Sequence, residues 1–336
     1  MMLRYLINRL AQMATILFVV SSITFFIVRF LPGDPVHLWV GDHPTKEQIN
    51  TARENLGLNK PIHTQYVFFL KNLCSLDFGL SLRTKQPVII ELSTRFPATF
   101  ELVFCSMFMA FIIGFPMGLI SAIKPKTLSD SFIRGFGYFG LSIPVFWLGM
   151  ILQLLFFGIL NWFPLQGQYS GFSFLENQLR YNTGFILIDS FLSREWNLFF
   201  DGIQHIILPA FTLSFGVLGM ILRTTRSAMM DTMKEPYFQT FISYGFSESE
   251  VVKKSAYKNT LIPVSTVVGL SFGLLLGGTF LVESIFDWPG LGQFSVLSIL
   301  TSDFPAIAGV TILYTFTYVI INFFIDVFYM FIDPRI

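Results

Sequence analysis

Six long apolar runs constrain this chain more than any other feature of its sequence. They cover residues 10–31, 98–123, 133–160, 203–222, 264–285 and 306–330. At about 1.5 Å of rise per residue, a helix over each run is long enough to cross a hydrocarbon core of roughly 30 Å. Of the 336 residues 53% are hydrophobic and 13% are charged, against about 25% charged residues in an ordinary soluble domain. The sequence therefore predicts an all-α integral membrane protein with six transmembrane helices.

The connections between these runs carry further helical patterns. The first connection, residues 32–97, has short helices predicted at 45–56, 61–73 and 88–95, with Thr45 as the cap of the first. The third connection covers residues 161–202 and the fifth, a short loop, residues 286–305. Proline in Ser-Ile-Pro at 142–144 predicts a bend in the third run, and Pro263 predicts a break before the fifth.

The distribution of Lys and Arg predicts the orientation. The two tails carry three of these residues, the second connection and its flank three (Lys124, Lys126 and Arg134) and the fourth connection six, whereas the third and fifth connections together carry two. Because short cytoplasmic connections are enriched in Lys and Arg, both termini and the fourth connection are expected to face the cytoplasm. The first connection holds seven, but connections longer than about 60 residues follow this rule poorly.

Residues 235–263 of the fourth connection include residues that are typical of the ends of two short helices. Gly245 suits the end of a helix over 237–244, because glycine tolerates positive φ. Ser247 and Glu250 then form the S-x-x-E pattern of a capping box. The pattern predicts a helix, a tight turn and a second helix, suited to docking by a separate protein. A solvated loop without a partner is the alternative.

Several kinds of chemistry have no support in the sequence. The motif G-x-x-x-x-G-K-[ST] of a nucleotide-binding P-loop does not occur, and the two Cys and four His lack metal-ligand spacing. The net charge of +1 gives no basis for nucleic-acid binding. Polar candidates inside the runs are few, namely Gln153, Asn322 and Asp326, which disfavours a proton-coupled carrier acting alone. An intramembrane enzyme would require paired carboxylates or a histidine near one interface.

Seven motifs in order give the chain a family resemblance. They are PGDP (32–35), LGLNKPIHTQY (56–66), DFGLSLRT (77–84), RFPATFEL (95–102), LSIPVFWLG (141–149), VESIFDWPGLG (282–292) and DPR (333–335). With them, residues 235–247 and 258–263 resemble the cytoplasmic EAA loop of type I ABC importer permeases of the peptide-transporting branch. TGFILID (183–189) followed by HIILPA (205–210) resembles the dipeptide members more than the oligopeptide or nickel members.

The resemblance implies a division of the chain and a set of partners. Residues 1–94 would form an N-terminal helix with a long extracytoplasmic region, 95–330 the permease domain with the EAA loop at 235–263, and 331–336 a cytoplasmic tail. The partners would be a second homologous permease, two cytoplasmic ABC ATPases that bind ATP and Mg, an extracytoplasmic peptide-binding protein and membrane lipid. The chain itself would hold no cofactor or metal and would catalyse no reaction. It would form half of a path for dipeptides or short oligopeptides across the bacterial inner membrane; nickel, glutathione or antimicrobial peptides are alternative cargoes.

Ten residues of the EAA loop are expected to couple the chain to an ATPase. They are Glu235, Tyr237, Phe238, Gln239, Thr240, Phe241, Gly245, Phe246, Ser247 and Glu250. Tyr237, Phe238, Phe241 and Phe246 are expected to give docking contacts, with packing between the two short helices as the alternative. Phe241 and Tyr244 stand where the family usually carries an alanine and a basic residue, which leaves open which ATPase the chain accepts.

Overall fold

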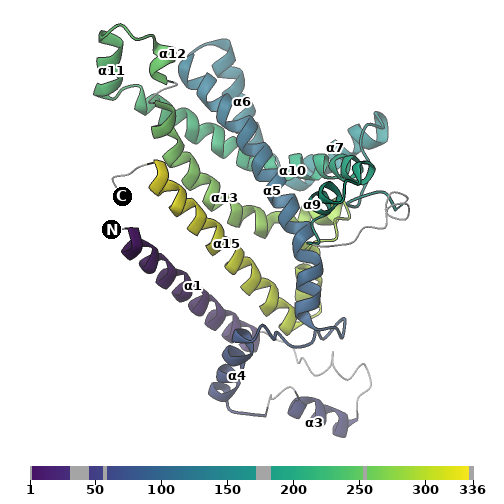
Figure 1. Cartoon of the computed structure of the whole chain (residues 1–336). Helices are drawn as coiled ribbons and strands as arrows, with labels where there is room; N and C mark the ends of the chain where they lie inside the picture. Colours follow the sequence, from purple (N-terminus) through teal and green to yellow (C-terminus); the bar gives the residue numbers. More distant parts are fainter. Residues whose placement is uncertain (1, 31–44, 56–58, 172–182, 253–255, 333–336) are drawn as a thin grey trace. The chain divides into compact units, whose positions relative to one another are not determined.

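The computed structural model describes residues 2–30, 45–55, 59–171, 183–252 and 256–332, and over these ranges it is almost wholly helical (Figure 1). The β-structure within those ranges is a single isolated bridge between Leu80 and Pro87. The chain divides into two compact units. Unit 1 comprises Met1–Pro97 with Gly290–Val319, and unit 2 comprises Ala98–Pro289 with Ile320–Ile336.

Unit 1 is built from α1 (Met2–Phe30), α3 (Lys46–Asn55), α4 (Ile62–Cys74), α14 (Leu291–Leu300) and the first parts of α5 (Val88–Ile123) and α15 (Phe304–Ile332). Its core places the start of α5 against α14 and α15, with Val88, Leu291 and Phe294 almost wholly buried. The buried carboxylate of Asp303 accepts hydrogen bonds from the Ser81 hydroxyl and from the backbone N–H of Leu82 at 3.0 Å. Segment 77–87 is thereby fixed to the start of α15.

Unit 2 is organised around α10 (Trp196–Thr232), the most buried of its long helices. α10 packs against α13 (Tyr257–Ile285), α6 (Leu128–Ser142), α7 (Val145–Gln153) and α9 (Ile186–Leu192). A Cβ added at Gly219 of α10 would lie 2.6 Å from the carbonyl oxygen of Gly137 in α6. The two helices therefore cross backbone to backbone, which small residues permit in membrane helices.

Five helices of the described chain have the length and hydropathy of membrane spans. They cover Ile7–Ile27, Val88–Ile123, Trp196–Thr232, Tyr257–Ile285 and Phe304–Tyr329. A sixth candidate is the pair formed by α6 and α7, which continues as the π-helix η1 (Leu154–Ile159) and bends by 105° at its break. The predicted bend at 142–144 is confirmed. Ile143 is extended (φ −80°, ψ 131°) because the proline that follows disfavours a helical conformation there.

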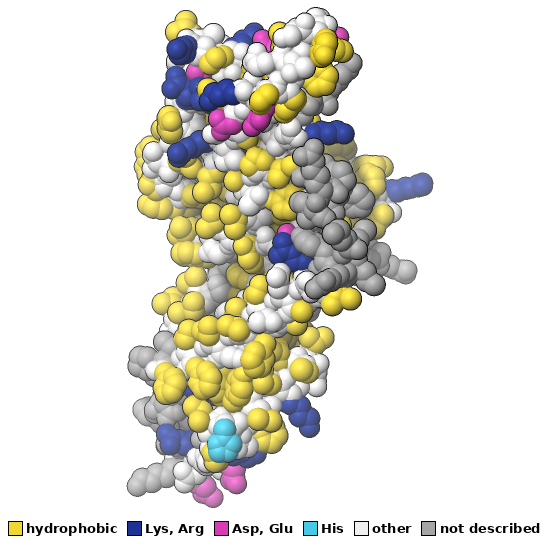
Figure 2. Space-filling model, turned by 90° about the vertical axis from the view of Figure 1, so that its left-hand side faces the viewer, with side chains coloured by type: hydrophobic (Ala, Val, Ile, Leu, Met, Phe, Trp, Pro, Cys, Tyr) yellow, Lys and Arg dark blue, Asp and Glu magenta, His cyan; other side chains and the backbone are white. Residues whose placement is uncertain are grey.

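The surface of the described chain agrees with a membrane environment. Figure 2 shows hydrophobic side chains over much of the visible face. Large apolar residues are exposed on several spans, among them Phe18 of α1, Phe104 of α5 and Phe324 of α15. Exposed apolar surface on this scale marks contact with lipid or with other proteins.

Three local predictions were wrong. Pro263 does not break the chain but lies inside α13, where it removes one hydrogen bond in the second turn of a long packed helix. Residues 88–95 are not a separate helix; they form the start of α5, which continues through Pro97. The predicted loop 286–305 contains α14, whose ten residues are too few for a span but fill the core of unit 1.

The short helices predicted at 45–56 and 61–73 are confirmed as α3 and α4. The N–H of Gln48 donates to the Thr45 side chain at 3.3 Å, so Thr45 caps α3 as predicted. The PGDP motif (32–35), Lys253, Lys254 and the DPR motif (333–335) lie outside the described residues.

Candidate functional site

The candidate site is the polar segment that joins α10 to α13. α11 (Pro236–Ser243) follows α10 after a turn at 233–235. Glu235 takes the N-cap position with extended backbone, and Pro236 opens the helix, where a missing N–H costs nothing. α12 (Glu248–Val251) comes next and leads to α13.

The end of α11 is a Schellman turn centred on Gly245. The Gly245 N–H donates to the Ile242 carbonyl at 2.9 Å, and the Phe246 N–H donates to the Phe241 carbonyl at 3.2 Å. Gly245 has φ +89°, a backbone conformation that favours glycine. The rings of Phe241 and Phe246 stack edge to face at 5.7 Å, which supplies the apolar contact that usually accompanies this turn. The predicted end of the helix is confirmed.

The start of α12 is a capping box, as predicted. The N–H of Ser247 donates to Glu250 Oε2 at 2.9 Å, and the Ser247 side chain in turn accepts from the backbone N–H of Glu250. Two backbone groups at the start of this one-turn helix are thus satisfied by its own side chains.

One face of the segment is packed against its own chain. Phe238 is 3% exposed and lies in a cluster with Ala122 of α5, Met229 of α10 and Val251 of α12. The half-buried Tyr237 accepts a hydrogen bond at 2.9 Å from Asn259 Nδ2 near the start of α13. The prediction that the Phe238 side chain forms part of a docking surface does not agree with this placement. Its ring is enclosed by the chain's own apolar residues, and it anchors α11.

The other face of the segment is exposed. Phe241, Tyr244 and Phe246, here called the α11 aromatic patch, are all exposed, and Tyr244 is 79% exposed. Gln239 and Thr240 are also exposed, and their side chains bond to the chain's own carbonyls, those of Met233 at 3.3 Å and Pro236 at 2.9 Å. Glu235 lies exposed at the start of the helix.

The ten predicted residues therefore divide by position. Tyr237 and Phe238 hold α11 to the ends of α5, α10 and α13; Gly245, Ser247 and Glu250 shape the turn; and Glu235, Gln239, Thr240, Phe241 and Phe246 lie on the exposed face. Within the described ranges, no three His, Cys, Asp or Glu side chains come together as a metal site requires. The geometry of this segment is that of a contact surface.

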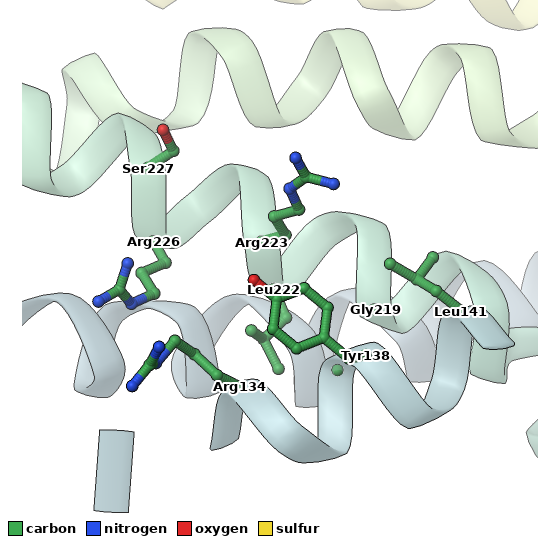
Figure 3. A pocket seen from close by; sticks show the side chains of 9 residues that line it. Arg134, Tyr138, Leu141, Gly219, Leu222, Arg223, Arg226 and Ser227 are labelled. Atoms are coloured by element: carbon green, nitrogen blue, oxygen red, sulfur yellow. The ribbon is translucent and has the colours of Figure 1, made fainter. Parts of the chain in front are cut away.

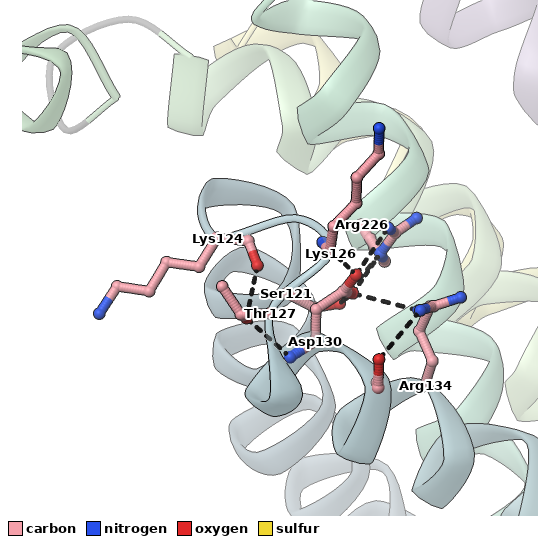
Figure 4. Close-up of polar contacts among 8 residues, drawn as sticks. Ser121, Lys124, Lys126, Thr127, Asp130, Arg134 and Arg226 are labelled. Atoms are coloured by element: carbon pink, nitrogen blue, oxygen red, sulfur yellow. Dashed lines mark hydrogen bonds and ion pairs between the residues drawn. The ribbon is translucent and has the colours of Figure 1, made fainter.

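A buried ion-pair network that the sequence did not predict holds the neighbouring helices (Figure 4). The Asp130 side chain is 1% exposed and accepts from the Ser121 hydroxyl, from the Lys126 N–H at 2.9 Å and from Arg226 Nε at 3.0 Å. Arg134 Nε lies 3.3 Å from the same carboxylate. Ser121 directly precedes Ala122 of the cluster under α11, so the network fixes the end of α5 to α6 and α10 beside that cluster. In the sequence the Lys and Arg residues of this network contribute only to the predicted orientation, and Asp130 carries no prediction.

The burial of two further carboxylates is also not predicted by the sequence. Glu283 of α13 accepts from the Thr99 hydroxyl at 2.7 Å, and Glu101 of α5 accepts from the Leu187 N–H at 2.9 Å. Gln153, which was noted in the third run, donates to the carbonyls of Leu165 at 2.8 Å and Ile285 at 3.3 Å. Each of these groups links segments of unit 2.

The chain matches two known families along most of its length. Residues 114–336 match the family described as "Binding-protein-dependent transport system inner membrane component", and residues 2–103 match the N-terminal family of the same membrane components.

Proteins with related sequences carry names that agree with these families. One is the probable D,D-dipeptide transport system permease protein of Escherichia coli strain K12, 40% identical over 320 residues, which cover 94% of this chain and 92% of the relative. A second is the di/tripeptide transport system permease protein of Pseudomonas aeruginosa strain UCBPP-PA14, 38% identical over 100% of this chain and 99% of the relative. A third is the glutathione transport system permease protein of E. coli strain K12, 35% identical over 100% of this chain and 99% of the relative.

These matches confirm the resemblance that the motifs indicated, and they agree with an all-helical chain carrying five or six membrane spans. The chain belongs to the family of binding-protein-dependent transport system inner membrane components.

Proposed function

We propose that this chain is a permease subunit of an ATP-driven ABC importer and forms half of the path by which dipeptides or short oligopeptides cross the bacterial inner membrane. Its partners are a second homologous permease, two cytoplasmic ABC ATPases that bind ATP and Mg, and an extracytoplasmic peptide-binding protein. Both termini and α11 face the cytoplasm, in keeping with the Lys and Arg distribution. Residues 1–94, 95–330 and 331–336 act as the N-terminal region, the permease domain and the cytoplasmic tail.

The observation that carries this proposal is the two-sided packing of α11. Its inner face is held by Phe238 and by the Tyr237–Asn259 hydrogen bond, whereas the α11 aromatic patch is exposed. Exposed aromatic rings are the side chains that most often dominate protein interfaces. A partner that grips the patch therefore acts on a helix that is already fixed to its own chain.

The connectivity explains how movement of a bound partner reaches the long helices α10 and α13. α11 follows α10 after a short turn, and Asn259 ties it to the start of α13. α10 and α13 make extensive contact with each other. Closure of the ATPases moves α11 as a rigid lever, and the ends of α10 and α13 move with it. The Gly245 turn and the Ser247–Glu250 capping box keep the segment compact during this motion.

The test combines uptake with co-purification. A strain that lacks the gene is complemented with the wild-type chain or with the double variant Phe241→Ala, Phe246→Ala. We expect wild type to restore uptake of a labelled dipeptide and to co-purify an ABC ATPase, and the double variant to lose both at normal expression. Phe200→Ala removes an exposed ring near the other end of α10 and should retain the ATPase. Dipeptide uptake by the purified chain in vesicles without any other protein would contradict the proposal.

Glutathione is the second candidate cargo, since a relative named as a glutathione permease is 35% identical over the whole chain. The same strains given labelled glutathione and labelled dipeptide in competition decide between the two. Uptake of the dipeptide with no inhibition by glutathione supports the first cargo.

A further inference from the structure

A pocket between α6 and α10 is lined by three arginines. Its cavity volume is about 170 Å³, and its lining includes Arg134 and Tyr138 from α6 and Arg223 and Arg226 from α10 (Figure 3). A volume of this size exceeds many times the roughly 15 Å³ that one water molecule requires, so the pocket has room for a phosphate group.

The charges of this pocket are not balanced within the described chain. Arg134 and Arg226 share one carboxylate, that of Asp130. Arg223 is exposed, and none of the described residues forms an ion pair or hydrogen bond with its side chain. Two guanidinium groups therefore share one carboxylate, and the third, that of Arg223, has no partner among the described residues. Guanidinium groups bind phosphate oxygens in charge-assisted pairs, so the pocket favours a phosphate-bearing ligand.

The edge of the pocket on α6 is largely apolar. Tyr138 is 56% exposed, and Leu141, about one turn further along the helix, is 41% exposed; both line the pocket. Leu141 directly precedes Ser142, the residue at which α6 ends.

We infer that the α6–α10 pocket binds the headgroup phosphate of an anionic phospholipid, whose acyl chains lie against the exposed side chains of Tyr138 and Leu141. A cationic pocket bordered by exposed apolar side chains fits a ligand with an anionic head and apolar tails. Basic pockets between membrane helices are known sites of this kind. Because α6 belongs to a candidate membrane span, lipid is present at its surface. This inference goes beyond the transport function and does not depend on the cargo or the ATPase.

Lipid binding to the purified full chain in detergent tests the inference. Native mass spectrometry measures the binding of dioleoyl phosphatidylglycerol and of dioleoyl phosphatidylcholine, which have the same acyl chains. We expect the anionic lipid to bind about tenfold more tightly, as a charge-assisted contact predicts. Equal binding of the two lipids would overturn the inference.

The variants assign the binding to this pocket. Arg223→Gln should weaken binding of phosphatidylglycerol about tenfold, and Arg223→Lys should restore most of it. Lys124→Gln removes a positive charge that points away from the Asp130 network in Figure 4, and it should change binding by less than about twofold. Circular dichroism and size-exclusion profiles report whether each variant is folded. Equal losses in the Gln variants of Arg223 and Lys124 would show nonspecific charge attraction and overturn the site.

Two further measurements separate lipid from other anionic groups. Inorganic phosphate at millimolar concentration should fail to displace phosphatidylglycerol, because it lacks the contacts of the acyl chains; full displacement would identify a free-anion site. Co-purification of the partner subunits with Arg223→Gln should match wild type. Loss of a partner while lipid binding stays unchanged would assign the arginines to a protein interface and overturn the inference.

Discussion

α11 and α14 are short helices that follow long ones, yet the chain uses them in opposite ways. α14, with ten residues, buries Leu291, Gly292, Phe294 and Ser298 in the core of unit 1. α11, with eight residues, buries Phe238 alone and exposes most of its other side chains. α14 is therefore part of the architecture. α11 has an anchored face and a free face, which is the arrangement expected of a surface that another protein contacts.

The largest effect on stability is expected in α14. Phe294→Ala removes a buried ring that also lies beneath the guanidinium groups of Arg83 and Arg95. The free energy of unfolding in detergent should fall by about 3–5 kcal/mol, the usual result of deleting a buried aromatic ring. Leu300→Ala, on the exposed side of the same helix, is the control and should change little. A small effect of Phe294→Ala would mean that α14 is not a core element.

A smaller effect is expected at the turn after α11. Gly245→Val places a β-branched residue at φ +89°, which costs about 1–2 kcal/mol of backbone strain. The turn should open, and ATP hydrolysis by the assembled transporter should no longer drive peptide uptake. The ratio of peptide transported to ATP hydrolysed in reconstituted vesicles measures this uncoupling. Gly278→Val is the control, because a Cβ added at this helical glycine would meet no atom from outside its own stretch of helix within 4 Å. Equal ratios in the two variants would argue against a specific role of the turn.

A single hydrogen bond tests the anchored face of α11. Tyr237→Phe removes the hydroxyl that accepts from Asn259, and the free energy of unfolding should fall by about 1 kcal/mol. Coupling should fall more than stability does, because the bond joins α11 to α13. Tyr244→Phe, which removes an exposed hydroxyl at the opposite end of α11, should leave both quantities unchanged. Equal coupling and equal stability of the two variants would show that the Tyr237–Asn259 hydrogen bond has no specific role in coupling.

The smallest effect on stability is expected in the α11 aromatic patch. Tyr244→Ala should change the free energy of unfolding of the isolated chain by less than about 0.5 kcal/mol, as is usual for an exposed position. The yield of co-purified ATPase should nevertheless fall several-fold, because aromatic side chains contribute strongly to interfaces. A loss of stability without a loss of ATPase would place Tyr244 in the chain's own core and reverse the contrast with α14.

Features set by local sequence could be predicted closely. The positions of the long helices, the cap at Thr45, the glycine turn at Gly245 and the capping box at Ser247 depend on residues a few positions apart. Their geometry follows from backbone preferences and short-range hydrogen bonds. The bend before Pro144 is of the same kind.

Features set by packing could not be predicted. Phe238 and Phe241 are aromatic residues of one short helix, and only the tertiary fold decides that the first is buried and the second exposed. Asp130 and Arg226 meet across 96 residues of sequence, and Thr99 and Glu283 across 184. The sequence predicts a loop where α14 lies, because the residues that α14 packs against come from distant parts of the chain.

The contact of Ser81 with Asp303 has a consequence for how the protein is made. The carboxylate that accepts hydrogen bonds from segment 81–83 is synthesised 222 residues after Ser81. At translation rates of about 5–20 residues per second, that interval lasts roughly 10–45 s. During this time the backbone N–H groups of Leu82 and Arg83 lack their native hydrogen-bond acceptor. A nascent chain that stops before residue 303 therefore lacks the side chain that fixes segment 81–83 in the folded protein.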